Sequence, residues 1–431
     1  MRFFPPQWFG HMHETMVSMD AHGEDRLGLY ISIPFCRSKC TYCNFASGVY
    51  PASEHGRYVE RLIEDLAAAN GWTERMGLKL PRRVDTVYLG GGTPSLLEPE
   101  LVGRLFGAVR GRFDLEPDAE ITVECAPGQI ADGTLEALRA EGVNRVSLGV
   151  QSFIDREAQV SGRLHTRAAV ENDLKRLRAA GITNLNADLI AGLAGQTRAS
   201  WDESVSVLID CGVPHASVYM LEVDEDSRLG REMLAGGARY YAELVPTDDA
   251  IAQMYTEAIE RLGQAGLKQY EISNFCRDGF ESKHNLRYWQ RRPYLGLGLD
   301  ASSALYEAGG DSSPFVLRST TTSELGDFLK RPETAETAWL SPARQHEEAW
   351  FLGLRMNRGV DVAAVEREFG AEPVARAVAV AEGLAEDGLV KMAGGTVRLT
   401  AQGRLLSNEV FQEFLGLDGE GLEDEERVGR G

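Results

Sequence analysis

Residues 35–45 read FCRSKCTYCNF and place three cysteines, Cys36, Cys40 and Cys43, at the spacing C-x3-C-x2-C. Thiols this close together are typical of a metal site. A structural zinc ion takes four protein ligands, but Phe45 stands where a fourth cysteine would follow, and the nearest other candidate is His55. The alternative is a [4Fe–4S] cluster in which three irons bind thiolates and one iron stays open. We favour the cluster over zinc.

The composition is that of a globular protein with one large domain and a smaller one. The chain has 431 residues, of which 43% are hydrophobic and 26% are charged. Six cysteines are too few for a disulfide framework. No apolar run approaches the roughly 18 residues of a membrane helix, and prolines interrupt the N-terminus, so we expect no signal peptide and a cytoplasmic location. A net charge of −20 argues against a nucleic-acid partner.

The main body of the chain alternates between strand and helix patterns. Six β-rich apolar runs are separated by helical spacings, which predicts a parallel α/β fold. These runs cover residues 27–35, 84–92, 120–127, 145–153, 182–192 and 215–223. Their near-continuous apolar character predicts strands that are buried on both faces.

Polar residues at the strand ends favour a barrel over an open doubly wound sheet. Gly92, Glu124, Gln151 and Asp188 each lie at or just past the end of a different predicted strand. Functional groups gathered from many strand ends on one rim are typical of a barrel. Because eight strands close a full barrel, six predict a partial (β/α)6 TIM-like barrel whose open side admits a bulky ligand.

The remaining segments complete the predicted domain organisation. We expect an irregular lead-in at 1–26, the barrel with its cysteine loop at 27–225, a barrel extension at 226–340, a small helical, winged-helix-like domain at 341–416, and an acidic disordered tail at 417–431. Within the small domain, the pattern predicts three helices, a hairpin and one last helix. The segment 310–340 gives little periodic signal.

The cysteine loop, following a first strand and carrying Tyr42 before its third cysteine, resembles that of the radical S-adenosylmethionine (SAM) superfamily. The resemblance implies a [4Fe–4S] cluster on Cys36, Cys40 and Cys43, with SAM bound at the open iron. Glycines let a backbone approach a ligand closely, and an arginine can fork onto a carboxylate. By this resemblance the residues near SAM are Tyr30, Tyr42, Gly91, Gly92, Thr93, Glu124, Gln151, Arg163 and Asp188.

The order and spacing of these residues are similar to those of oxygen-independent coproporphyrinogen III oxidase and its relatives, from about residue 27 to 415. The oxidases carry a fourth loop cysteine where this chain has Phe45, so we expect that the chain is not an oxidase of this kind. HNLRYW at 284–289 resembles the haem-binding motif of HemW-type haem chaperones. Neutral imidazole ligates haem iron, which makes His284 the candidate haem ligand. A structural histidine is the alternative.

The resemblance implies a haem chaperone that passes haem to acceptor haemoproteins, membrane-associated ones included, with an electron donor as a further partner if SAM is cleaved. Two alternatives stay open: a coproporphyrinogen III oxidase, and a radical SAM enzyme that acts on RNA or protein, which the acidity disfavours. Whether the chain is an enzyme therefore stays open. Three positions, Ala194, Asp300 and Ser302, depart from the pattern of the relatives, which usually read proline, glycine and histidine there.

Overall fold

The computed structural model describes residues 25–309, 315–330 and 335–417. Nearly all of the predicted lead-in and of the predicted acidic tail lies outside these residues. None of the helices in the described part of the chain is both long enough and apolar enough to cross a membrane.

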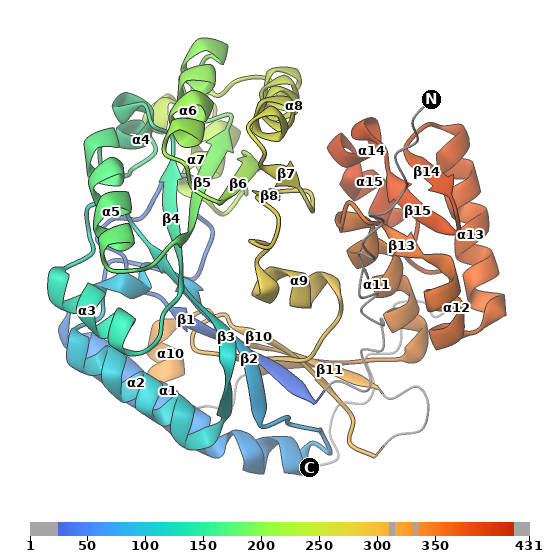
Figure 1. The fold of residues 1–431 in the computed structure, drawn as a ribbon, viewed down its shortest axis with the longest axis horizontal. Helices are drawn as coiled ribbons and strands as arrows, with labels where there is room; N and C mark the ends of the chain where they lie inside the picture. Colours follow the sequence, from blue (N-terminus) through green and yellow to red (C-terminus); the bar gives the residue numbers. More distant parts are fainter. Residues whose placement is uncertain (1–24, 310–314, 331–334, 418–431) are drawn as a thin grey trace, which may run out of the picture.

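Six parallel strands form the centre of the sheet in chain order, which confirms the predicted parallel α/β fold (Figure 1). They are β1 (Arg26–Ile33), β2 (Arg83–Gly91), β3 (Asp114–Cys125), β4 (Arg145–Gln151), β5 (Asn184–Ala191) and β6 (His215–Met220). Helices cover the outer face of these strands (Figure 1). The connecting helices are α1 (Ser53–Arg75), η2 (Pro94–Leu96), α2 (Pro99–Arg112), α3 (Asp132–Ala140), α4 (Asp155–Val160), α5 (Arg167–Ala179) and α6 (Arg198–Asp210).

Further strands extend the sheet at both edges, so that it is mixed and stays open, as a partial barrel requires. Beyond β1 lie β9 (Tyr294–Leu297), β10 (Ser302–Tyr306), β11 (Val316–Thr321) and β12 (Ala335–Leu340); beyond β6 lie β8 (Asn274–Cys276) and β7 (Lys268–Gln269). The sequence did not predict β11 and β12. Their Ser, Thr and Glu side chains, partly exposed in β11, obscure the alternation that would have indicated strands.

The segment after β6 also contributes helices around the barrel. These are α7 (Arg228–Leu234), η3 (Arg239–Leu244), α8 (Asp248–Gln264), α9 (Lys283–Trp289) and α10 (Leu325–Lys330). Helix α8 is the one that the spacing predicts at 248–265. Helix α9 carries the HNLRYW motif and packs against β2.

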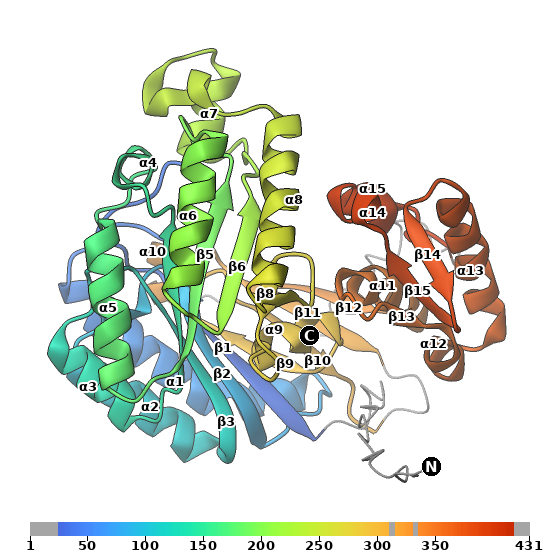
Figure 2. The same ribbon diagram turned by 45° about the horizontal axis from the view of Figure 1, so that its top comes forward.

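A small domain of helices and a three-stranded sheet ends the described chain, set to one side of the barrel (Figure 2). It contains α11 (Pro342–Arg355), β13 (Val360–Asp361), α12 (Val362–Phe369), α13 (Ala371–Glu386), β14 (Val390–Ala393), β15 (Thr396–Leu399), α14 (Ala401–Leu405) and α15 (Ser407–Gln412). Trp350 stacks on Phe414 in a core of its own. The single last helix that the sequence predicts is two short helices, interrupted at Leu406.

The central strands are largely buried on both faces, as predicted, but the two faces differ in polarity. Leu29, Ile31 and Val87 are completely buried between the sheet and the outer helices. Residues that alternate with such positions line the inside of the barrel and are largely polar. Examples are Tyr88, Glu124, Ser147, Asn186, Asp188, His215 and Ser217. The interior is therefore built to hold polar contacts rather than a dry core.

Candidate functional site

A cavity of about 570 Å³ lies between the cysteine loop and the carboxyl ends of the central strands. It is lined by all of the residues predicted to bind the cluster or SAM except Tyr30. These lining residues are Cys36, Cys40, Tyr42, Cys43, Gly91, Gly92, Thr93, Glu124, Gln151, Arg163 and Asp188. Because parallel strands present their carboxyl ends on one rim, residues distant in sequence meet there.

Backbone hydrogen bonds hold the cysteine loop. The N–H of Cys36 donates to the carbonyl of Gly48 at 2.9 Å, and the N–H of Gly48 donates to the carbonyl of Pro34 at 2.9 Å. The N–H of Thr41 donates to the carbonyl of Ser161, at 3.0 Å, on the far side of the barrel mouth. These contacts fix the loop that carries the three cysteines against the cavity.

Three thiols beside the cavity are the donor set that a [4Fe–4S] cluster with one open iron takes. His55, the candidate fourth zinc ligand, lies 3.2 Å from Glu98 through its Nδ1 and packs against Phe35. In a [4Fe–4S] cluster each thiolate binds a different iron, so the three sulfurs need not converge on one point.

The glycine-rich turn after β2 fits closely against the cysteine loop. The N–H groups of Gly92 and Thr93 donate to the carbonyls of Ile33 and Phe35, both at 2.8 Å. A Cβ at Gly92 would lie 2.8 Å from each of those two oxygens. Glycine is therefore required where the turn and the loop meet. The Thr93 hydroxyl lies 3.9 Å from the sulfur of Cys36.

Two carboxylates lie on the inner wall of the cavity. Glu124 accepts a hydrogen bond of 2.7 Å from the Tyr88 hydroxyl, and burial raises the pKa of Glu124 to about 7. Asp188 accepts from Asn186 Nδ2 at 2.7 Å and from the Ser147 hydroxyl at 3.2 Å, and burial raises its pKa as well. Both can accept further hydrogen bonds from a ligand's ammonium or hydroxyl groups.

Two polar atoms beside the cavity are buried and have no hydrogen-bond partner among the described residues. They are Gln151 Oε1 and Arg163 Nε. Gln151 also has a left-handed backbone, with φ of 67° at the end of β4. Buried polar groups are normally satisfied, and a strained backbone recurs at functional sites. The arrangement is that of a polar binding site.

Tyr30 and His284 lie away from the cavity lining, further inside the barrel. Tyr30 pairs with Tyr88 across β1 and β2, and their rings stack at 6.1 Å. The ring of His284 packs against both tyrosines, with its centroid 5.2 Å from that of Tyr88 and 6.5 Å from that of Tyr30. His284 is 1% exposed, with Nδ1 2.9 Å from the Thr86 hydroxyl and Nε2 2.8 Å from the Tyr288 hydroxyl.

Electrostatics keep this histidine neutral. Burial, followed by the charges of Arg287 and Arg145, lowers the pKa of His284 to about 3. A neutral imidazole is the form that binds iron. In the observed arrangement, however, both ring nitrogens already have a hydrogen-bond partner, so Nε2 becomes available only if its contact with Tyr288 opens.

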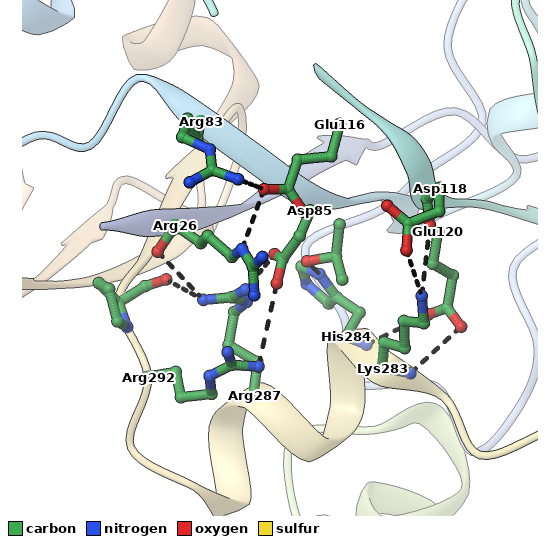
Figure 3. Close-up of polar contacts among 12 residues, drawn as sticks. Arg26, Arg83, Asp85, Glu116, Asp118, Glu120, Lys283, His284, Arg287 and Arg292 are labelled. Atoms are coloured by element: carbon green, nitrogen blue, oxygen red, sulfur yellow. Dashed lines mark hydrogen bonds and ion pairs between the residues drawn. The ribbon is translucent and has the colours of Figure 1, made fainter. Parts of the chain in front are cut away.

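Helix α9 is docked to the barrel at both of its ends (Figure 3). The carboxylate of Glu120 on β3 accepts from the backbone N–H groups of Lys283 and His284, each at 3.1 Å. A carboxylate at a helix N-terminus is favoured by the helix dipole. Further along α9, the buried Arg287 forms an ion pair with Asp85 on β2 (Figure 3). Gly28 on β1 leaves the space that the Arg287 side chain occupies.

Comparison with known proteins places the chain in a family. Residues 30–208 match the family model "Radical SAM superfamily", and residues 340–406 match "HemN C-terminal domain". "Heme chaperone HemW" of Lactococcus lactis is 33% identical over 389 residues, which cover 90% of this chain and 96% of the relative. The chain belongs to the HemW family. The HemW of Bacillus subtilis is 32% identical over 393 residues, covering 90% of this chain and 98% of the relative.

A solved structure shares the fold of this HemW-family protein. The coproporphyrinogen III oxidase HemN from Escherichia coli, described as a radical SAM enzyme, superposes with a TM-score of 0.76 and covers 92% of each chain. At 23% identity this likeness shows the fold alone. It confirms the predicted combination of a radical SAM-type α/β domain and a C-terminal helical domain.

Three positions that depart from the pattern of the relatives, Phe45, Asp300 and Ser302, have identifiable local contacts or conformations. Phe45 lines the mouth of the cavity with 62% of its surface exposed. Asp300 has a left-handed backbone, with φ of 52°, which is a conformation that glycine adopts more readily. Ser302 lies on β10 and its hydroxyl is 2.8 Å from that of Thr320. Nothing in the structure explains Ala194.

Sequence reasoning missed further polar residues in and behind the wall of the cavity, of which Ser147 is a lining residue. Tyr88, Ser147, Asn186 and His215 contact the cavity carboxylates or one another. Their spacing in the sequence indicates them, because each lies two or four residues before a strand-end position. Tyr88 is two and four residues before Gly90 and Gly92, Ser147 is two and four residues before Gly149 and Gln151, and Asn186 is two residues before Asp188. Side chains with that spacing share one face of a strand.

Proposed function

We propose that this HemW-family protein binds haem and passes it to acceptor haemoproteins in the cytoplasm or at the membrane. In this proposal Cys36, Cys40 and Cys43 hold a [4Fe–4S] cluster, and the adjoining cavity holds SAM. The observation that carries the proposal is that the three cysteines and the polar candidates Glu124, Gln151, Arg163 and Asp188 line one cavity. The names of the HemW relatives support haem as the cargo.

The residues of the cavity suit SAM in charge and in hydrogen-bonding groups. Arg163 would fork onto the carboxylate of SAM, and Glu124 and Asp188 would accept from its ammonium and ribose hydroxyls. The glycine turn would let the ligand approach the backbone, and Gln151 and Tyr42 would supply further polar contacts. When bound, the cluster would supply an electron to SAM if an external donor reduces it.

His284 is the proposed haem ligand. Its neutral imidazole suits iron, and Tyr288 and Trp289 would lie against the porphyrin. Because Nε2 is hydrogen-bonded to Tyr288 and His284 is buried, haem binding at this nitrogen requires α9 to open. The proposal therefore includes a change in the position of this helix when haem binds.

The test combines haem titration, haem transfer and enzyme assay on one anaerobic preparation. Haem binding followed by transfer to an apo-haemoprotein supports the proposal. The competing function, coproporphyrinogen III oxidation, is tested by adding coproporphyrinogen, SAM and a reductant to the same preparation. Protoporphyrinogen formation without haem binding would overturn the proposed function in favour of the oxidase.

A further inference from the structure

A continuous chain of side-chain hydrogen bonds runs from the cavity to the start of α9. Asp188 accepts from Asn186 Nδ2 at 2.7 Å, and Asn186 Oδ1 lies 2.7 Å from His215 Nδ1. His215 Nε2 lies 2.9 Å from the Tyr270 hydroxyl. The oxygen of Tyr270 accepts from the backbone N–H of Ser282 at 3.2 Å. We call these five residues the relay.

The far end of the relay positions α9. Ser282 is the N-cap residue of this helix, and its hydroxyl accepts from the N–H of Asn285 at 3.3 Å. An N-cap residue fixes where its helix begins. A displacement of Tyr270 would therefore act on the helix that carries His284.

The hydrogen bonds of the relay all have the same direction. Burial and the charge of Arg145 lower the pKa of His215 well below its usual value, so its ring is neutral and carries one proton. Since Asn186 Oδ1 is an acceptor, that proton is on Nδ1, and Nε2 accepts from the Tyr270 hydroxyl. Each group thus accepts on one side and donates on the other, an order that makes hydrogen bonds reinforce one another.

At the cavity end of the relay, several acceptors compete for the Asn186 amide. The two N–H groups of the Asn186 amide have three acceptors within reach: Ser147 Oγ at 2.7 Å, Asp188 Oδ1 at 2.7 Å and Ser217 Oγ at 3.0 Å. Two protons cannot satisfy three acceptors at once. A cavity ligand that donates to Asp188 would change which acceptors Asn186 serves, and hence where its Oδ1 holds His215.

The relay connects the cavity to a helix, α9, that does not itself line the cavity. None of the α9 residues is among those that line the cavity. Ser147, Asn186 and His215 are register partners on β4, β5 and β6, which places them in one row across the barrel interior. An effect of cavity occupancy on α9 must accordingly pass through side chains between them.

We propose that the relay couples occupancy of the SAM cavity to the position of α9, with His215 and Tyr270 as positioning residues. This inference rests on the proposed function in so far as SAM is the occupant. In this proposal SAM acts without being cleaved, because the bound ligand determines how readily α9, which carries the HNLRYW motif, opens. Reciprocally, opening of α9 changes the affinity of the cavity for SAM.

Hydrogen exchange on the full-length protein with its cluster tests the coupling without haem. The probes are the amides of Leu286 and Gln290, which are hydrogen-bonded within α9. In the wild type, SAM is expected to slow their exchange by about fivefold or more, the lower range of measured couplings. Tyr270→Phe removes the hydroxyl with little change of shape, and His215→Phe breaks a second link; each is expected to abolish the effect of SAM.

Tyr255→Phe is the matched control, because its hydroxyl also makes buried hydrogen bonds, to Ile272 and Gln269, but lies outside the relay. It is expected to keep the wild-type response. A separate SAM titration shows whether a missing response in α9 comes from loss of the coupling or from loss of SAM binding. SAM binding with no response in α9 of the wild type, or a full response in Tyr270→Phe, overturns the relay alone. Absence of SAM binding overturns the relay and the proposed SAM site together.

Discussion

The ring of Tyr88 stacks on that of His284, with 5.2 Å between the ring centroids, while the Tyr88 hydroxyl donates to Glu124 at the cavity. One side chain on β2 therefore contacts both a carboxylate of the proposed SAM site and the proposed haem ligand. The proposed SAM site and the proposed haem ligand are therefore close in space, although no α9 residue lines the cavity.

Substitutions at His284 and Tyr288 are expected to change haem affinity in opposite directions. His284→Ala removes the proposed ligand and should weaken haem binding strongly while leaving the cluster absorption unchanged. Tyr288→Phe removes the hydroxyl that holds Nε2. Because that hydrogen bond must break before iron can bind, its loss should strengthen haem binding by roughly fivefold, the equivalent of one ordinary hydrogen bond.

Anaerobic haem titrations of the two variants and of the wild type provide the measurement. Unchanged binding by His284→Ala would remove this histidine from the haem site. Equal weakening by both variants would mean that the Tyr288 hydroxyl contacts haem directly rather than restraining the histidine.

Glu124 is expected to make the stability of the fold depend on pH. Burial raises its pKa from 4.5 to about 7, so the folded state keeps a proton that the unfolded state releases. The stabilisation is fully present below about pH 4.5 and is lost as the pH rises through about 7, a loss of about 3 kcal/mol. Glu124→Gln removes this contribution.

Urea unfolding of the wild type and of Glu124→Gln between pH 4.5 and 8 tests this expectation. The difference in unfolding free energy between the two proteins should change across this range. Glu100→Gln, which alters an exposed carboxylate on α2, is the control. Parallel curves for the wild type and Glu124→Gln would show that Glu124 titrates as an ordinary carboxylate.

Arg163→Met is expected to weaken SAM binding without loss of the cluster. The guanidinium lies at the cavity and its Nε has no hydrogen-bond partner among the described residues. Loss of a charged hydrogen bond to the SAM carboxylate should lower affinity by roughly 10- to 100-fold in calorimetric titration. Arg167→Met removes a nearby exposed arginine that pairs with Glu171, and it should bind SAM normally. Equal affinities of both variants would contradict the assigned role.

Gly92→Ala is expected to impair cluster assembly. The added methyl group would lie 2.8 Å from the carbonyl oxygens of Ile33 and Phe35, which support the cysteine loop. Such overpacking costs about 1–3 kcal/mol and should displace the loop. Iron and sulfide content after reconstitution is the measurement. Gly107→Ala on α2 meets no neighbouring atom within 4 Å and should keep full iron content, so similar losses in both would point to a general folding defect.

The sequence predicted what depends on local pattern and on strand order. The alternation of strands and helices placed Gly92, Glu124, Gln151 and Asp188 at strand ends, and parallel packing then brought them to one rim. The spacing of the three cysteines indicated the loop. In each case neighbouring residues along the chain carry the information.

Contacts between distant segments could not be predicted in the same way. Tyr270 contacts His215 because β8 pairs antiparallel with β6 at an edge of the sheet. The helical spacing of the segment before β8 does not indicate this pairing. The burial of His284 likewise depends on the space left by Gly28 for Arg287. The motif identified His284 as important but did not reveal that both of its ring nitrogens have partners.

The most direct test of the account is the metal content and SAM response of anaerobically purified protein. The account predicts about four iron and four sulfide per chain, with an electron paramagnetic resonance signal of the reduced cluster that changes when SAM is added. Cys36→Ala, Cys40→Ala and Cys43→Ala should each abolish both. Colourless protein that contains tetrahedral zinc, or a cluster signal indifferent to SAM, would contradict the open iron on which the account depends.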